Sequence, residues 1–360
     1  MRYILKSYFV TSIVIGAIIG IAILLSNQVG PTINKDSTEI FKNDEALYSY
    51  VRKYGPKQSI IRLNELVPLY GSCHNSAHRA GHFAYEIYST ESFRTCGSEC
   101  HSGCYHGATE AFFKEHGTAN LTENLRTLCD SELNAFFSHQ CIHGIGHGLM
   151  AWTSYELFDA LESCDLLSAR QSSCWTGVFM ENIVGTLGQE NGHTTKYLSQ
   201  DPLYPCNDPK LDEKYKSSCY FLQTSRMVQL YGVDFAKVAT ACLQAPTSYQ
   251  HSCFESMGRD IGGVHHADPS GAIAACQNAP IGNIRISCLI GAAQDTFWDP
   301  GGQDIALSFC KLLTNQDEKN SCYQTIFSRA TEVLTSNKFL TVFCDKVEQG
   351  YREACRKVIR

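Results

Sequence analysis

Cysteine spacing constrains the fold of this chain more than any other feature of its sequence. From residue 129 onward the cysteines fall into seven pairs whose members lie 10 to 13 residues apart. The predicted pairs are Cys129–Cys141, Cys164–Cys174, Cys206–Cys219, Cys242–Cys253, Cys276–Cys288, Cys310–Cys322 and Cys344–Cys355. The second cysteines, counted from Cys104, recur every 33 to 37 residues, apart from one step of 45. A period of this length predicts stacked two-helix units, because a single hairpin cannot bury its apolar face.

One unit can be followed between residues 268 and 288. Asp268 is followed by a proline, which is typical of the start of a helix. The first helix is expected to end near Cys276, and asparagine, proline and glycine between 278 and 282 mark a turn. A second helix is expected from about Ile286, with Cys288 in its first turn. A disulfide would therefore join the end of one helix to the start of the next.

Four cysteines near the front of the chain allow three pairings: Cys73, Cys96, Cys100 and Cys104. Cys104 begins a second helix like the later second cysteines, which favours Cys96–Cys104 and leaves Cys73–Cys100. The number of cysteines is even, so every one can be bridged, and bridges indicate a compartment outside the reducing cytosol.

Period, hairpin pattern and one bridge per hairpin together resemble tetratricopeptide and Sel1-like repeat arrays over about residues 70–360. The tetratricopeptide signature residues are missing, and the loop spacing varies. The resemblance implies an all-α fold, an α-solenoid of about eight disulfide-stapled helical hairpins, with a closed α/α toroid as the alternative. It implies little about function, because one fold supports many activities.

An uncharged apolar segment, residues 9–25, precedes the repeats and is long enough for a transmembrane helix. Arg2 and Lys6 lie before it, and positive charge on that side predicts a cytoplasmic N-terminus. A cleaved signal peptide is the alternative. Both alternatives place the rest of the chain outside the cytoplasm. A retained anchor predicts a single-pass protein of the cell membrane.

The expected organisation has a cytoplasmic N-terminus (1–8), the anchor, a polar linker (26–45) and an extracytoplasmic helical-repeat domain (46–360). Within that domain, residues 70–150 are rich in histidine and residues 151–360 hold the later repeats. The formal net charge of −6 gives no basic surface for nucleic acid, so no nucleic-acid partner is expected.

Histidines in the first third of the chain recur four residues apart, the spacing that places side chains on one face of a helix. His106 and His143 each follow the second cysteine of their pair by two residues, and Glu110 and His147 follow it by six. These are equivalent positions on helices that would pack about 8–10 Å apart, close enough to share an ion. The predicted metal ligands are His78, His82, His106, Glu110, His143 and His147.

Imidazole with carboxylate suits zinc, copper or iron, so a divalent transition metal is the expected cofactor. Glu110 and Glu181 are the candidate catalytic groups, since a carboxylate near an open metal position could activate water. Two alternatives stay open: histidines that only pack within the helices, and a metal-free site of proton transfer.

The later units carry a charged residue seven positions after each second cysteine: Glu181, Arg226, Asp260, Asp295 and Arg329. Salt bridges between repeats on a solvated surface are one explanation of this ladder. The other is a polar groove in which a protein or peptide would lie.

The sequence thus predicts a membrane-anchored extracytoplasmic metal-binding protein that could use the metal in catalysis. A non-enzymatic solenoid scaffold or receptor, binding a protein or peptide partner in its concave groove, is the alternative.

Overall fold

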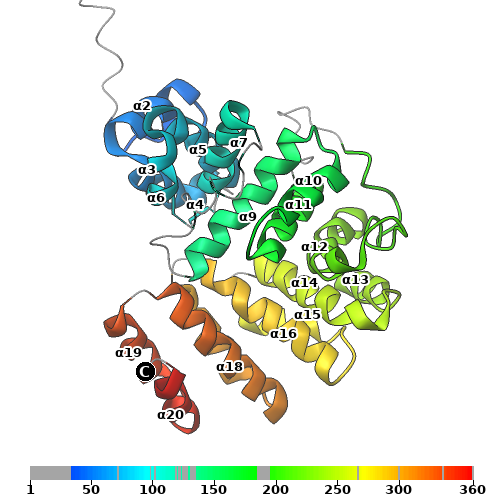
Figure 1. Ribbon diagram of the computed structural model, residues 1–360. Coiled ribbons are helices and arrows are strands. Elements are labelled where there is room, and N and C mark those ends of the chain that lie inside the picture. Colours follow the sequence, from blue (N-terminus) through cyan, green and yellow to red (C-terminus); the bar gives the residue numbers. More distant parts are fainter. Residues whose placement is uncertain are drawn as a thin grey trace, which may run out of the picture.

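The computed structural model is built from helices, and the described residues contain no β-strand (Figure 1). It describes residues 34–70, 73–97, 99–100, 103–117, 120, 123, 129, 135–184, 195–265, 267–298, 301–334 and 336–358. The all-α prediction is confirmed for this part of the chain. None of the helices in it is long and apolar enough to cross a bilayer. The predicted anchor, 9–25, and the segment before it lie outside the described residues.

Eight helices carry the second cysteine of a pair, and these second helices run through the whole array. They are α7 (Gly103–His116), α9 (Ala135–Trp152), α11 (Gln171–Val184), α12 (Glu213–Tyr231), α14 (Thr247–His265), α16 (Asn283–Asp295), α18 (Gln316–Val333) and α20 (Gln349–Val358). Between them lie the shorter first helices α10 (Leu157–Asp165), α13 (Phe235–Cys242), α15 (Pro269–Cys276), α17 (Gly302–Leu312) and α19 (Asn337–Lys346).

The N-terminal part packs before α7. It contains α2 (Asp44–Tyr54), α3 (Pro56–Glu65), α4 (Val67–Tyr70), α5 (His74–Tyr88) and α6 (Ser92–Thr95). Among the described residues, short 3₁₀ helices lie at Glu39–Phe41, Ser89–Glu91 and Thr296–Trp298. Within the predicted linker, 26–45, Ile40 in the first of these 3₁₀ helices is fully buried, and α2 begins at Asp44.

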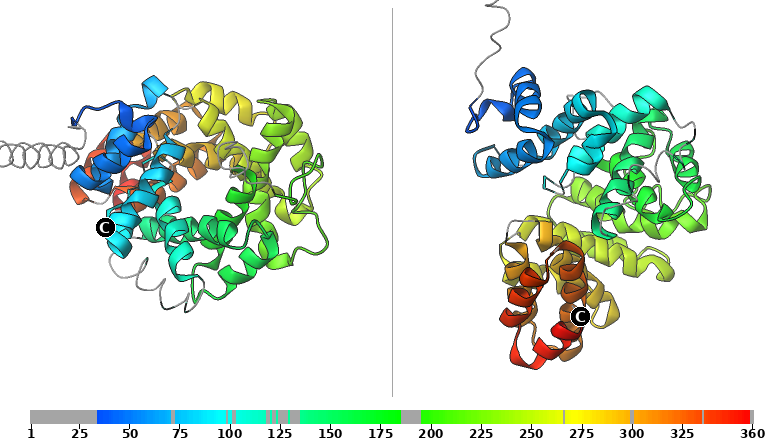
Figure 2. Two further views of the ribbon diagram at one scale, coloured as in Figure 1. Left: turned by 90° about the horizontal axis from the view of Figure 1, so that it is seen from above. Right: turned by 60° about the vertical axis from the view of Figure 1, so that its left-hand side comes forward.

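The eight second helices pack side by side in chain order, from α7 to α20. Helix α5 packs on α7 and so begins the row. First helices pack against this row, as α10 does on α9 and α11. Seen from above, the row curves around a common centre, and in the rotated view its last helices lie below its first (Figure 2). Near the end of the curved row, α18 contacts α9.

All eighteen cysteines form nine disulfides, and every predicted pair is confirmed, including Cys73–Cys100 and Cys96–Cys104. The bridged Cα atoms are 5.3 to 5.7 Å apart, within the ordinary range for disulfides. Each bridge within a hairpin closes a short loop and contributes about 2–4 kcal/mol to stability. The bridges thus hold each first helix to its second helix.

The helix start and end predicted between residues 268 and 276 are confirmed, and only the start of the second helix differs from the prediction. Asp268 caps α15 by accepting a hydrogen bond from the Gly271 amide, and the helix ends at Cys276. The second helix α16 begins at Asn283, three residues before the predicted start. Gly282 precedes it with φ of 104°, a left-handed conformation that glycine adopts without strain, so the helix can start directly after the turn.

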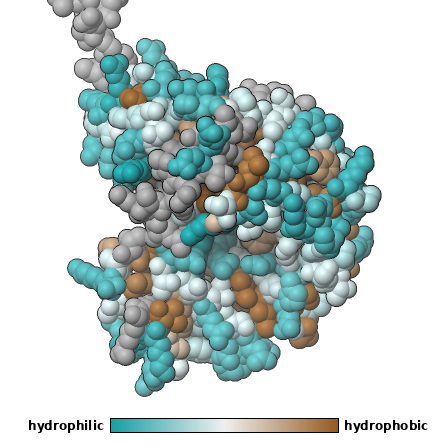
Figure 3. All heavy atoms as spheres, viewed as in Figure 1, coloured by the Kyte–Doolittle hydropathy of each residue, from teal (hydrophilic) through white to brown (hydrophobic). Residues whose placement is uncertain are grey.

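The surface seen in Figure 3 is mostly polar, with apolar residues scattered in small groups. Such a distribution is ordinary for a globular surface and does not by itself identify a binding face.

Candidate metal centre

Glycine contacts bring the backbones of neighbouring helices together at α5 and α7, at α9 and α11, and also at α14 and α16. A Cβ atom on Gly107 of α7 would lie 1.8 Å from the carbonyl oxygen of His78 on α5. A Cβ on Gly177 of α11 would lie 1.9 Å from the carbonyl oxygen of His143 on α9. Only glycine fits at these contacts, and the short spacing between helices brings polar side chains of one helix against those of the next.

Three histidines from α7 and α9 form a buried cluster, called the buried triad here: His106, His143 and His147. Each offers a ring nitrogen within 4.8 Å of the other two. The Nε2 atoms of His143 and His147 are 3.2 Å apart, and the His106 ring stacks on the His147 ring with centroids 3.7 Å apart. The exposed fractions of the three residues are 1%, 8% and 1% in chain order, so bulk water hardly reaches them.

Glu181 on α11 holds the His147 ring in place. Nδ1 of His147 lies 2.7 Å from Oε2 of this carboxylate, whose other oxygen accepts a hydrogen bond from the Tyr155 hydroxyl at 2.9 Å. Burial alone would raise the pKa of Glu181, but the hydrogen bond and charge of His147 outweigh it and hold that pKa below its usual value. Because an ionised carboxylate only accepts, His147 donates from Nδ1, and its Nε2 is directed at His143.

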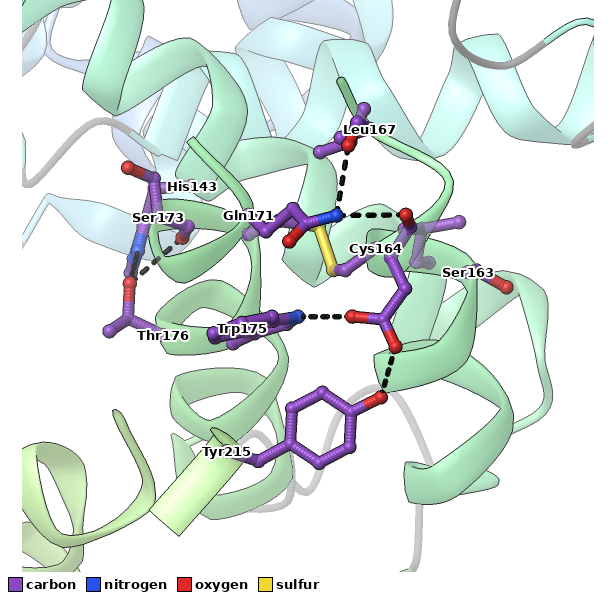
Figure 4. The surroundings of a disulfide bond; sticks show 12 residues. His143, Ser163, Cys164, Leu167, Gln171, Ser173, Trp175, Thr176 and Tyr215 are labelled. Atoms are coloured by element: carbon purple, nitrogen blue, oxygen red, sulfur yellow. Dashed lines mark hydrogen bonds between the residues drawn. A yellow bond between two sulfur atoms is a disulfide. The ribbon is translucent and has the colours of Figure 1, made fainter. Parts of the chain in front are cut away.

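Thr176 on α11 does the same for His143. Its hydroxyl donates to the carbonyl of Ser173 at 2.8 Å and therefore accepts from Nδ1 of His143 at 3.1 Å (Figure 4). Nε2 of His143 is then an acceptor. Figure 4 shows this contact beside the bridge formed by Cys164, which holds α10 to α11.

Two ring nitrogens 3.2 Å apart have either a proton or a metal ion between them. Burial and the neighbouring His147, His139 and Arg259 lower the pKa of His143 well below its usual value, so His143 is neutral and its Nε2 can accept either a hydrogen bond from His147 or a metal ion. A metal ion fits, because nitrogens at about 2.0 Å from tetrahedral zinc lie about 3.3 Å from each other.

His106 supplies the third donor. Neither of its ring nitrogens has a hydrogen-bond partner among the described residues, although the ring is buried. Burial and the neighbouring histidines, His147 first, lower its pKa well below the usual range. A buried polar ring without partners costs free energy in the metal-free protein, and a bound ion would remove that cost.

The other three predicted ligands form a separate group, called the outer triad here: His78 and His82 on α5 and Glu110 on α7. Nε2 of His78 lies 3.2 Å from Oε1 of Glu110, and Nε2 of His82 lies 2.8 Å from Oε2. Burial would raise the pKa of Glu110, but the charge of His78 and the hydrogen bonds from both histidines hold it far below its usual value. For His78 burial acts to lower the pKa, yet Glu110 raises it above the usual value.

The six predicted residues are thus brought into one region but divided into two triads. The His78 and His106 rings, one from each triad, have centroids 6.1 Å apart. Glu110 was expected beside His106 and His143. It contacts His78 and His82 on α5, the two histidines that were expected to close the same pocket.

The sequence pattern H-x-x-G-H occurs in both triads, at residues 78–82 and 143–147. The glycine lets the next helix approach, and that helix then presents a carboxylate, Glu110 in one case and Glu181 in the other. This repetition is a sequence signal that the spacing argument overlooked. Thr176 and Tyr155 were also missed, and a single threonine or tyrosine carries no comparable signal.

The charged ladder is not a simple series of surface salt bridges. Glu181 is buried against His147 and Tyr155. Asp260 accepts hydrogen bonds from Thr224 and Ser225 on the preceding second helix. Hydroxyl groups therefore make contacts between repeats that a charge pattern could not predict.

No protein-family model, curated protein or solved structure matches the chain in the comparisons made.

Proposed function

We propose that this protein binds a divalent transition metal ion at the buried triad. The observation that supports this best is the pair of Nε2 atoms of His143 and His147, which face each other at 3.2 Å beside the unpartnered His106 ring. Glu181 and Thr176 hold the opposite ring nitrogens, the arrangement that orients metal-bound histidine in proteins. Three imidazoles without a sulfur ligand suit zinc, copper or iron.

The low exposure of the triad favours an ion that is held tightly and reacts little with solvent. Glu181 is committed to His147 and Tyr155, so it orients a ligand and is a poor candidate for a catalytic base. The proposed role of this site is therefore retention of a metal that also stabilises the contact between α7, α9 and α11.

The proposed setting is the outer face of a cell membrane, with residues 9–25 as the anchor. Nine disulfides support a non-reducing compartment. The curved row of paired helices supports an α-solenoid related in architecture to Sel1-like and tetratricopeptide arrays. Protease added to intact cells should remove the repeat domain, and full protection would contradict this topology.

A scaffold or receptor that binds a protein or peptide is the second proposal. The ladder supports it, since Arg226 and Asp260 are only half-buried and lie on consecutive second helices. In that case metal removal would leave partner binding unchanged.

The direct test is elemental analysis of the full chain, purified in detergent without chelators. The double variant His143→Ala with His147→Ala should lose one equivalent of metal relative to wild type. His251→Ala is the matched control, because His251 is exposed on α14, hydrogen-bonds Ser287 and belongs to neither triad. Unchanged metal content in the double variant would exclude the buried triad as the site.

A further inference from the structure

The outer triad repeats the design of the buried triad at a place that solvent can reach. In both, two histidines four residues apart lie on one helix and the next helix presents a carboxylate, which contacts both His78 and His82 in the outer triad but only His147 in the buried one. The side chains of His78, His82 and Glu110 are 18%, 37% and 20% exposed. An ion could therefore enter the outer triad without any helix moving.

The helices that carry the outer triad are held in fixed register. A Cβ on Gly81 of α5 would lie 2.1 Å from the carbonyl oxygen of Cys104, and Gly107 makes the reciprocal contact with His78. Cys104 is also bridged to Cys96. Glu110 therefore meets the two imidazoles through a rigid backbone contact, and a preorganised set of donors binds an ion with little loss of entropy.

The distances within the outer triad suit coordination. Its donor atoms all lie within 4.8 Å of one another, and the two nitrogen-to-oxygen distances are 3.2 and 2.8 Å. Ligand atoms around zinc or iron at about 2.0–2.2 Å are separated by similar distances. Two imidazoles converge on Glu110, one at each carboxylate oxygen.

We propose that His78, His82 and Glu110 form a second cation site, of the two-histidine, one-carboxylate type. Three protein ligands leave one or more positions for water or a small anion, as in catalytic zinc and non-haem iron sites. The proposal goes beyond the buried triad and holds whether or not that triad is occupied. Any reaction on a bound small molecule would then belong to the outer triad.

Titration of the metal-free full chain with Co²⁺ tests this. Wild type should bind two equivalents. His78→Ala with His82→Ala should reduce this to one, and His143→Ala with His147→Ala should also reduce it to one. Glu110→Gln should weaken only the outer site, since the amide keeps the size of the side chain but loses the charge. Far-ultraviolet circular dichroism checks that each variant stays folded. His82→Ala alone, which removes the most exposed of the three side chains, is the fallback if the double variant unfolds.

The outcomes separate the two proposals. One equivalent in wild type that disappears only with the His143 and His147 changes would overturn the outer site and leave the buried site. One equivalent that disappears only with the His78 and His82 changes would overturn the buried site and leave the outer site. With the buried site removed, azide should alter the visible spectrum of the remaining Co²⁺; an unaltered spectrum would overturn the open coordination position.

Discussion

At the scale of single residues, Glu181 and Thr176 decide which nitrogen of each buried imidazole carries the proton. Both accept from Nδ1, so both Nε2 atoms face the same point. Spacing in the sequence predicted the paired histidines, because residues four apart share a helix face. It could not predict the tautomers, which depend on hydrogen bonds from α11 made only in the folded chain.

The residue-scale prediction concerns the carboxylate behind His147. Glu181→Gln should weaken metal binding at the buried triad about 10- to 100-fold, as is usual when a carboxylate that orients a metal-bound histidine is lost. The amide no longer enforces donation from Nδ1. Competition with a chromophoric chelator measures the affinity. Glu156→Gln, on an exposed carboxylate that pairs with Lys196, is the control and should bind as wild type does.

At the scale of elements, glycine contacts set the distance between second helices. Gly81 with Gly107, and Gly146 with Gly177, let α5 approach α7 and α9 approach α11 until the backbones touch. The repeat period and the bridges predicted which helices pair, since both can be read from the cysteines. The division into two triads could not be predicted, because it depends on which neighbouring helix each turn of α7 faces.

The element-scale prediction is that Gly177→Ala destabilises the protein by about 1–3 kcal/mol, the usual cost of overpacking a close contact. The new methyl group would meet the carbonyl oxygen of His143. Gly350→Ala, in α20 with open space around it, should be neutral or slightly stabilising because alanine favours helix. Chemical denaturation with the bridges intact measures both. Equal stabilities for the two variants would contradict the close approach of α9 and α11.

At the scale of the whole molecule, the curved row brings α18 back to α9. Arg329 on α18 acts on His139 near the start of α9, whose Nδ1 lies 2.7 Å from the Ser173 hydroxyl. Burial first, and then the charges of Arg329 and Arg170, lower the pKa of His139 to about 4. The sequence did not reveal this contact, since the closure of a helical array depends on small rotations summed over many repeats.

The whole-molecule prediction follows from that pKa. A histidine with a lowered pKa in the folded state contributes stability that is present above about pH 6.5 and is lost as pH falls toward the folded pKa. Arg329→Gln should therefore raise the pKa of His139, measured by NMR, and make the acid loss of stability smaller. Arg356→Gln, which removes an exposed pair with Asp345, should leave it unchanged. The same His139 pKa in wild type and Arg329→Gln would mean that α18 does not lie against α9 in solution.

Anomalous X-ray diffraction from crystals of the protein grown with zinc tests the central claim most directly. The account predicts an anomalous peak between His143 and His147, about 2.0 Å from both Nε2 atoms, with a ring nitrogen of His106 as the third ligand. Density between these rings without an anomalous peak, or rings turned so that the Nε2 atoms no longer face each other, would contradict it.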